Sequence, residues 1–470
     1  MVVQHNMQAL NANRMLGVTT GLQAKSTEKL SSGYKINRAA DDAAGLSISE
    51  KMRKQIKGLD KASTNAQDGI SAVQTAEGAL TEVHSMLQRM NELAVQAANG
   101  TNSESDRQSI QDEIDQLTTE IDRVAETTKF NETYLLKGNG KDTTVNINAK
   151  DAGIEGLLTG EGTGQAKFVM DALETGSQIT IGSKGYTIGT AVDDVRGEVD
   201  PDEVSKVIIN GTEYNVVAED AEEDETTNTF KASTVQSFIS DGDKVTIGSK
   251  KFVAMTDEGP DGVGDNDASV ITAEKAYELI ANELVKASSV GADPGDAQAA
   301  LVDADGDPEE ATNIVADGDG KVTFHIKEGT VATTQGLQFS LHVGADADEN
   351  NKIALTIDAM DSTSLGVHGL NLVDNTGAKA TYAIDAIADA VSKVSAQRSA
   401  LGAVQNRLEH TIANLDNVVE NTTSAESQIR DTDMAAEMVN YSKNNILAQA
   451  GQAMLAQANT STQGVLSLLG

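Results

Sequence analysis

Apolar residues recur on a helical repeat over the first hundred residues of the chain. From Asp41 to Asn99 there is no proline, and positions spaced alternately four and three residues apart form a heptad seam. Such a seam stays on one face of a supercoiling helix, where partner helices bury it. We therefore expect one long helix that needs helical partners. Its seam positions are Met52, Ile56, Leu59, Ser63, Ala66, Ile70, Val73, Glu77, Leu80, His84, Leu87, Asn91, Ala94 and Ala98.

Shorter helical patterns flank this long helix. Residues 2–30 form a weakly amphipathic helix candidate that should end at Gly33, because glycine tolerates the left-handed cap conformation. Ser103 with Asp106 resembles a capping box for a following helix. We expect that helix to fold back antiparallel on the long one. Its stripe repeats the four-three spacing at Ile110, Ile114, Leu117, Ile121 and Val124.

The heptads return from Tyr382 onwards. Arg398 and Gln405 interrupt this second seam, a common way of fixing the register of a coiled coil. A last helix, rich in alanine and glutamine, is expected from about Thr432 to Asn459, and the N-terminal helix is its candidate partner. The seam positions are Ile384, Ile387, Val391, Val394, Leu401, Leu408, Ile412, Leu415 and Val419.

The middle of the chain alternates apolar and polar residues instead, which is typical of strands. Ile179–Lys184 recurs almost unchanged as Val245–Lys250, and Val207–Tyr214 reads as a hairpin with an Asn-Gly turn. A short helix is expected near Ala273–Lys286. Further strands are predicted at Thr144–Asn148, Val322–Ile326, Leu337–Leu341 and Ile353–Ile357.

These patterns predict an α+β protein. Long antiparallel helical coiled-coil arms come from both termini, and a β-rich domain is inserted between them. The predicted parts are an N-terminal arm at 1–42, the N-terminal half of a helical rod at 43–150, a surface-exposed insert at 151–334, the C-terminal half of the rod at 335–431 and a C-terminal arm at 432–470.

Charge and composition exclude several classes of function. The net charge is −36, and residues 141–380 hold 45 acidic but only 16 basic residues. This argues against binding to nucleic acid or anionic lipid, which needs basic patches. The absence of cysteine excludes disulfides and thiolate metal sites. No apolar run could span a bilayer, and residues 1–16 lack the apolar core of a secretory signal, so if the protein is secreted, we expect secretion without a cleaved signal peptide.

The sequence gives only a weak signal for a metal site. Asp303, Asp305 and Asp307 alternate like the start of a calcium loop, but Pro308 stands where the sharp turn needs glycine. A solvated acidic loop is therefore expected. No His-Glu-x-x-His motif occurs, so we predict no metal, no cofactor and no enzymatic activity.

Both arms resemble bacterial flagellin. The matching stretches are LSSGYKINRAADDAAGLSISEKM at 30–52, NAQDGISAVQTAEGAL at 65–80, MLQRMNELAVQAANGT at 86–101, SKVSAQRSALGAVQNRL at 392–408 and ILAQAGQAMLAQAN followed by VLSLL. The resemblance implies a structural subunit that polymerises with itself into the extracellular flagellar filament for motility. It further implies type III export, an export chaperone that grips the C-terminal arm, and contacts with filament cap and hook-associated proteins.

The resemblance also implies recognition by host Toll-like receptor 5. Gln88, Arg89, Leu93 and Glu113 match the positions where flagellins meet that receptor. We expect Arg89 and Leu93, four residues apart, to share an outward helix face. A solvated arginine and a leucine packed for assembly are the plain alternative. The match departs at Asn91, where many family members carry a basic residue.

Three other interpretations remain open at this point. The insert could act as an adhesin or carry another binding activity, which glycan binding by the insert would reveal. It could carry an enzyme, although the missing metal motif disfavours this. The chain could be a hook–filament junction protein, although both arms match flagellin along their length.

Overall fold

The computed structural model divides the chain into two units, each built from segments that are distant in sequence. It describes residues 6–160, 162, 164–200, 204–257, 259, 261–295, 297–310, 314 and 316–467. The terminal unit comprises 1–71, 340–355 and 404–470, and the central unit comprises 72–339 and 356–403. Two long helices, α2 (Ala43–Ala98) and α8 (Ala378–Arg430), have one part in each unit.

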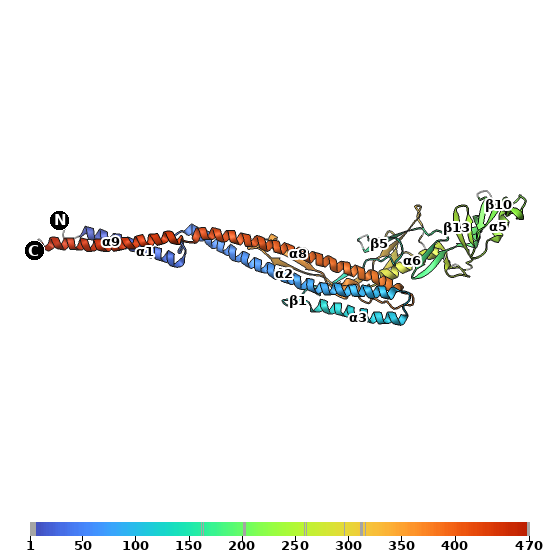
Figure 1. The fold of residues 1–470 in the computed structure, drawn as a ribbon, viewed down its shortest axis with the longest axis horizontal. Helices are drawn as coiled ribbons and strands as arrows, with labels where there is room; N and C mark the ends of the chain where they lie inside the picture. Colours follow the sequence, from blue (N-terminus) through green and yellow to red (C-terminus); the bar gives the residue numbers. More distant parts are fainter. Residues whose placement is uncertain are drawn as a thin grey trace. The chain divides into compact units, whose positions relative to one another are not determined.

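The N- and C-terminal arms pair in the terminal unit, as predicted. Helix α1 (Met7–Ser32) lies antiparallel beside α9 (Met434–Ser467), drawn in blue and red in Figure 1. The side chain of Asn6 donates a hydrogen bond to the carbonyl of Ala458 at 3.1 Å. At the other end α1 stops at Gly33, which has a φ of 77° and caps the helix as expected.

The seam of α2 corrects our prediction. The first stripe is confirmed, because Ala66, Val73, Leu80, Leu87 and Ala94 are all buried. The second stripe lies one residue earlier than predicted, so Ser63, Ile70, Glu77, His84, Asn91 and Ala98 are only half-buried. Both registers keep the four-three spacing, but the observed one places small or apolar residues in the seam. The buried second stripe is Ala62, Gly69, Ala76, Val83, Met90 and Ala97.

Helix α8 shows the same displacement. Ala383, Ala390 and Gln397 are buried, whereas Ile384 and Val391 are half-buried. Arg398 and Gln405 therefore do not interrupt the seam, contrary to our prediction. The polar residue inside the seam is Gln397, which donates a hydrogen bond to the carbonyl of Thr356 at 3.1 Å and so remains paired.

In the central unit, α2 has helical partners on two sides. Helix α3 (Glu104–Thr127) begins at the predicted capping box of Ser103 and Asp106 and runs back antiparallel, which places Glu113 2.9 Å from Arg89. On another side, Arg398 of α8 approaches Glu77 at 3.8 Å. Two partners bury a wider arc of α2 than a single seam would.

The predicted hairpins are present, and each gains a parallel third strand that leads into a helix. Strand β10 pairs with β11, β13 with β8, and β7 with β14. The chain thus forms an inner module, β8 to β13, inserted between β7 and β14 of an outer module. The elements are β6 (Gln178–Ile181), β7 (Lys184–Ile188), β8 (Thr190–Ala191), α4 (Val192–Gly197), β9 (Lys206–Ile209), β10 (Thr212–Val217), the 3₁₀ turn η1 (Glu225–Thr227), β11 (Thr229–Lys231), α5 (Ala232–Phe238), β12 (Lys244–Ile247), β13 (Lys250–Met255), β14 (Val270–Ile271) and α6 (Ala273–Ser288).

Two sheets carry these modules. The inner module is a six-stranded sheet in the order β11-β10-β9-β12-β13-β8, and the outer module has the order β14-β7-β6. The turn at Asn210-Gly211 has φ angles of 50° and 87°, as a two-residue hairpin of alternating strands requires. The modules bury different cores, one around Phe168, Phe324 and α6 and another around Val207, Val235 and Val245.

The remaining strands lie partly in the insert and partly in the segments that flank it. A four-stranded sheet has the order β15-β16-β5-β4, and β1-β2, β17-β3 and β18-β19 are pairs. The strands predicted near residues 144, 322, 337 and 353 are confirmed as β3, β16, β18 and β19. The elements are β1 (Lys129–Phe130), β2 (Thr133–Tyr134), β3 (Asp142–Asn146), β4 (Leu157–Gly160), β5 (Gln165–Asp171), β15 (Ala300–Val302), β16 (Lys321–Lys327), β17 (Thr330–Thr334), β18 (Leu337–His342), η3 (Glu349–Asn351), β19 (Lys352–Ile357) and α7 (Ser362–Leu365).

Candidate functional site

The α1–α9 pair is held together by small residues. Ser26 of α1 and Ala448 of α9 are buried, and a Cβ added at Gly451 would lie 3.4 Å from Leu16 Cδ1. Small residues allow two helices to approach closely. The pairing therefore uses little of the large apolar surface that the arms carry.

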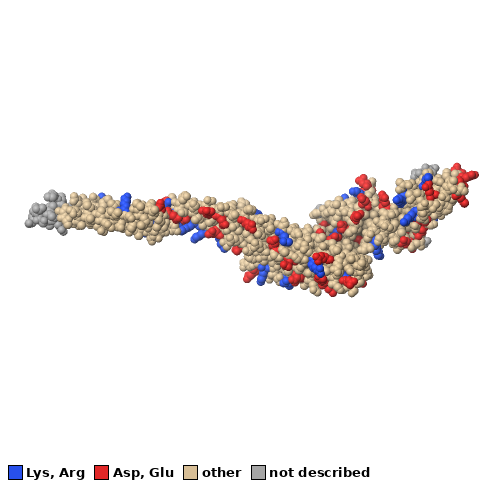
Figure 2. All heavy atoms as spheres, viewed as in Figure 1, with Lys and Arg blue, Asp and Glu red and all other residues tan. Residues whose placement is uncertain are grey.

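Large apolar side chains of both arms point into solvent instead. Ile446 of α9 is 66% exposed, and five large apolar residues of α1 are exposed as well. Figure 2 shows few charged side chains on the viewed face of this pair. Many exposed large apolar side chains on one helix pair are typical of a site of protein association. Its members are Met7, Leu10, Met15, Val18, Leu22, Met434, Met438, Val439, Ile446, Leu447 and Met454. The apolar run VLSLL, residues 465–469, lies outside the described side chains.

Arg89 forms the centre of a second candidate surface, on the outer side of α2 and α3. Its guanidinium contacts Glu113 at 2.9 Å and Glu92 at 3.1 Å, and half of its side chain is exposed. The hydrogen bonds that Arg89 donates to Glu113, the larger effect, and to Glu92 raise the pKa of Arg89 above its usual value. Gln88 is exposed beside it and lies 3.0 Å from His84 Nε2. Three of the four predicted receptor residues thus lie together at the surface.

Leu93 does not share that exposure, and our prediction that it points outward is wrong. The residue is only 2% exposed. It sits between the seam residues Met90 and Ala97, on the arc of α2 that its two helical partners bury. A site at Arg89 would therefore have Leu93 beneath it rather than at its surface.

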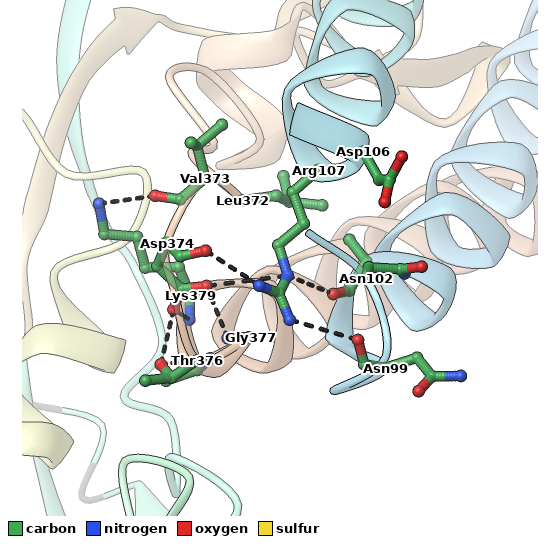
Figure 3. A network of polar contacts seen from close by, with 12 residues as sticks. Asn99, Asn102, Asp106, Arg107, Leu372, Val373, Asp374, Thr376, Gly377 and Lys379 are labelled. Carbon is green, nitrogen blue, oxygen red and sulfur yellow. Dashed lines mark hydrogen bonds and ion pairs between the residues drawn. The ribbon is translucent and has the colours of Figure 1, made fainter. Parts of the chain in front are cut away.

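Sequence reasoning missed a buried arginine at the turn between α2 and α3. Arg107 is 1% exposed and donates hydrogen bonds to three carbonyls, of Ala97 at 2.8 Å, Asp374 at 3.0 Å and Asn99 at 3.2 Å. Figure 3 shows its guanidinium between the α2–α3 turn and the segment that precedes α8. One signal was available, since Arg107 lies on the apolar stripe of α3, one turn before Ile110.

Asp374 completes this junction. Its carboxylate accepts hydrogen bonds from the backbone N–H of Gly377 at 2.6 Å and of Lys379 at 3.1 Å, and lies 4.0 Å from Arg107. Gly377 has a φ of 86°, and a Cβ there would lie 2.9 Å from the carbonyl of Ala98. Only glycine fits such a close approach with this conformation. The junction orders three segments but presents no chemistry at the surface.

The acidic loop at Asp303 is a hydrogen-bonded turn. One carboxylate oxygen of Asp303 accepts the N–H groups of Asp305 at 3.0 Å and Asp307 at 2.9 Å. Across the described residues, no group of three or more His, Cys, Asp or Glu side chains is placed to hold a metal ion. Among the helices that the structure describes, none is long and apolar enough to span a membrane.

Comparisons with known proteins point to one family. The model of the bacterial flagellin N-terminal helical region matches residues 3–141, and that of the C-terminal helical region matches 384–469. A flagellin of Clostridium tyrobutyricum is 38% identical over 98% of this chain and 100% of its own length. A flagellin of Halalkalibacterium halodurans is 32% identical over 100% of both chains. The solved flagellar hook-associated protein 3 from Legionella pneumophila is 14% identical, covering 81% of this chain and 98% of its own, but its TM-score of 0.32 is too low to carry an argument.

Proposed function

This chain belongs to the bacterial flagellin family of filament structural proteins, and we propose that it polymerises through its terminal arms into the flagellar filament used for motility. The observation that carries this proposal is the exposed apolar surface of α1 and α9. Pairing of the two arms leaves that surface uncovered, so a second copy of the chain is the partner that would bury it. The protein would then act by helix packing, outside the cell, and not by catalysis.

A charge placed on this surface tests the proposal. Ile446→Lys should abolish polymerisation while leaving the circular dichroism of the monomer unchanged, because a lysine at an exposed position does not disturb folding but cannot be buried between subunits. Leu157→Lys is the matched control, since Leu157 is 67% exposed but lies on β4 in the insert. Filaments formed at the same critical concentration by Ile446→Lys and the parent would contradict the proposal.

The insert at 151–334 should be dispensable for assembly. Its modules bury their own cores and add no residue to α1 or α9. A variant lacking 151–334 should still form filaments visible by electron microscopy. Export of the variant as a protein that stays monomeric under polymerising conditions would oppose this view.

The C-terminal arm also suits the other partners that the family resemblance implies. Before assembly, the apolar side chains of α9 need cover, which an export chaperone would provide. Filament cap and hook-associated proteins would meet the same arms at the ends of the filament. Removal of 434–470 should eliminate chaperone binding in a titration, and undiminished binding would assign the chaperone to another segment.

We further propose that Gln88, Arg89 and Glu113 form a surface recognised by Toll-like receptor 5, with Leu93 supporting it from below. The clamp of Arg89 by Glu113 and Glu92 supports this, because a side chain held in one conformation loses less entropy on binding. An arginine within a mixed charged and apolar patch is a frequent hot spot. In the filament, packing between subunits would hide the same face.

Binding of the receptor ectodomain to monomer and to filament tests both the receptor surface at Arg89 and its burial in the filament. Arg89→Ala should weaken monomer binding by about 2 kcal/mol, a hot-spot value, without changing the helical circular dichroism. Arg123→Ala is the matched control, because Arg123 is an exposed arginine of α3 paired with Glu120. An equal loss of receptor binding in both variants, or equal binding per subunit by filament and monomer, would contradict the assignment of Arg89 to the receptor site.

A further inference from the structure

Four ionisable side chains meet where the chain passes from the helices into the insert. Lys150 follows β3, and Asp385, Asp389 and Lys393 succeed one another at four-residue spacing on α8, so they share one helix face. We call these four residues the Lys150 cluster. Lys150 is buried and the three residues of α8 are half-buried, which is unusual for charged side chains.

Lys150 ties the cluster to the insert by two hydrogen bonds, and Lys393 ties it to α7. The Lys150 ammonium donates to the carbonyl of Val290 at 3.3 Å, and its backbone N–H donates to Ser288 Oγ at 2.9 Å. On α8, the Lys393 ammonium donates to the carbonyl of Ser364 at 3.4 Å. The cluster therefore joins α8 to the segment after β3 and to the end of α6.

Asp385 is the weak point of this arrangement. Its Oδ2 atom is buried and has no hydrogen-bond partner among the residues that the structure describes. A buried carboxylate oxygen without a donor is costly when charged, and protonation relieves that cost. The charged groups that act on it are Asp151 and Lys150 from the insert side and Asp389 from α8.

The pKa values of the four groups in the cluster are shifted by their burial. Burial, with Asp151 and Asp389, raises the pKa of Asp385 to about 6 in spite of Lys150. Burial lowers the pKa of Lys150 to about 8 in spite of Asp389 and Asp385. Burial likewise raises the pKa of Asp389 and lowers that of Lys393. From α6, Glu283 is already engaged by the Tyr382 hydroxyl and by Lys286 at 2.8 Å.

We propose that the Lys150 cluster is a protonation-sensitive joint, which holds the insert to α8 least firmly near neutral pH and more firmly once Asp385 takes up a proton. An aspartate whose folded pKa is raised stabilises the fold below its unfolded pKa of 3.8, and this stability is lost as pH rises through about 6. A lysine whose folded pKa is lowered stabilises the fold above 10.5, and this is lost as pH falls through about 8. Between these two values both groups are charged, and the joint is at its weakest.

Hydrogen exchange of the full-length monomer tests the joint. The segments 148–154 and 288–292 should open roughly tenfold less often at about pH 5 than at about pH 7.5, after correction for intrinsic exchange, because the folded state takes up the extra proton. Asp385→Asn should remove this dependence and give the protected behaviour at both pH values. Asp416→Asn, at an exposed position of α8, should behave like the parent.

Two results would overturn the proposal. One is parent exchange in these segments that does not change with pH, and the other is an unchanged pH dependence in Asp385→Asn. If Asp385→Asn loses helical circular dichroism, Lys150→Met provides the second test. It removes the buried amine, so protection near neutral pH should rise and the dependence above about pH 8 should vanish. Persistence of that alkaline dependence in Lys150→Met would equally refute the joint.

Discussion

Replacement of Arg107 by methionine should open the junction between α2, α3 and the segment before α8. Methionine retains much of the apolar stem of arginine, so packing is largely preserved and the loss falls on the guanidinium. That group donates three hydrogen bonds, to the carbonyls of Ala97, Asn99 and Asp374. Each hydrogen bond contributes about 1 kcal/mol net, so the free energy of opening the junction should fall by about 3 kcal/mol.

The contribution of the neighbouring carboxylate should be smaller. Asp374 lies 4.0 Å from Arg107 and keeps the donors of Gly377 and Lys379 when the arginine is removed. Burial alone would raise the pKa of Asp374, but the N–H groups of Lys379 and Gly377, the Thr376 hydroxyl and Arg107 together lower it. A lowered pKa stabilises the fold above 3.8, and this stability is lost as pH falls further. Acid should therefore loosen the junction only well below pH 4.

Local hydrogen exchange is the suitable assay, because the chain has two units and no single unfolding transition is assured. In Arg107→Met, residues 97–103 and 372–379 should exchange roughly a hundredfold faster, which corresponds to about 3 kcal/mol. The hairpin of β9 and β10 serves as an internal reference and should not change. Arg123→Met, which removes an exposed arginine from α3, should alter exchange by less than about threefold. Equal effects of the two variants would refute the structural role of Arg107.

Substitutions at buried and exposed positions test the packing and capping of the helices. Leu93→Ala should lower the free energy of local opening around α2 and α3 by about 2–5 kcal/mol in hydrogen exchange, because Leu93 is buried. Val95 is exposed, so Val95→Ala should change that free energy by less than about 0.5 kcal/mol. Gly69→Ala should destabilise by about 1–3 kcal/mol, since the new Cβ would lie 2.2 Å from Leu341 Cδ1. At Gly78, on the same helix, an added Cβ would meet no described atom within 4 Å, so Gly78→Ala should stabilise the helix by about 0.5–1 kcal/mol. A more stable helix in Gly69→Ala than in Gly78→Ala would contradict the observed seam. Ser103→Ala should remove the capping box of α3 and cost about 1 kcal/mol in the same assay.

Most helices and strands could be predicted from the sequence, because hydrophobic periodicity is a local property of the chain. The heptad spacing, the cap at Gly33, the capping box at Ser103 and the Asn-Gly hairpin were all readable from short windows. The second seam stripe was missed by one residue in both α2 and α8. That error was avoidable, since Ala62, Ala76, Val83 and Met90 are more apolar than Ser63, Glu77, His84 and Asn91.

Other features depend on long-range contacts that no window contains. Neither Arg107 nor Lys150 was singled out from the sequence, and their surroundings include Asp374 and Asp385, more than two hundred residues away. The repeated hairpin motif was visible, but the pairing of β8 with β13 and of β14 with β7 was not, because a parallel third strand carries no signal of its own. Leu93 was judged outward from a seam with one partner helix, and the second partner changed its environment.

Hydrogen exchange of α1 and α9 in monomer and filament tests the assembly mechanism most directly. Their large apolar side chains are exposed in the single chain, so residues 7–32 and 434–461 should show little protection as monomer. Polymerisation should bury this surface and slow exchange there by roughly a hundredfold or more, while the inner module at 190–255 should change little. Equal protection of both arms in monomer and filament would contradict assembly through α1 and α9.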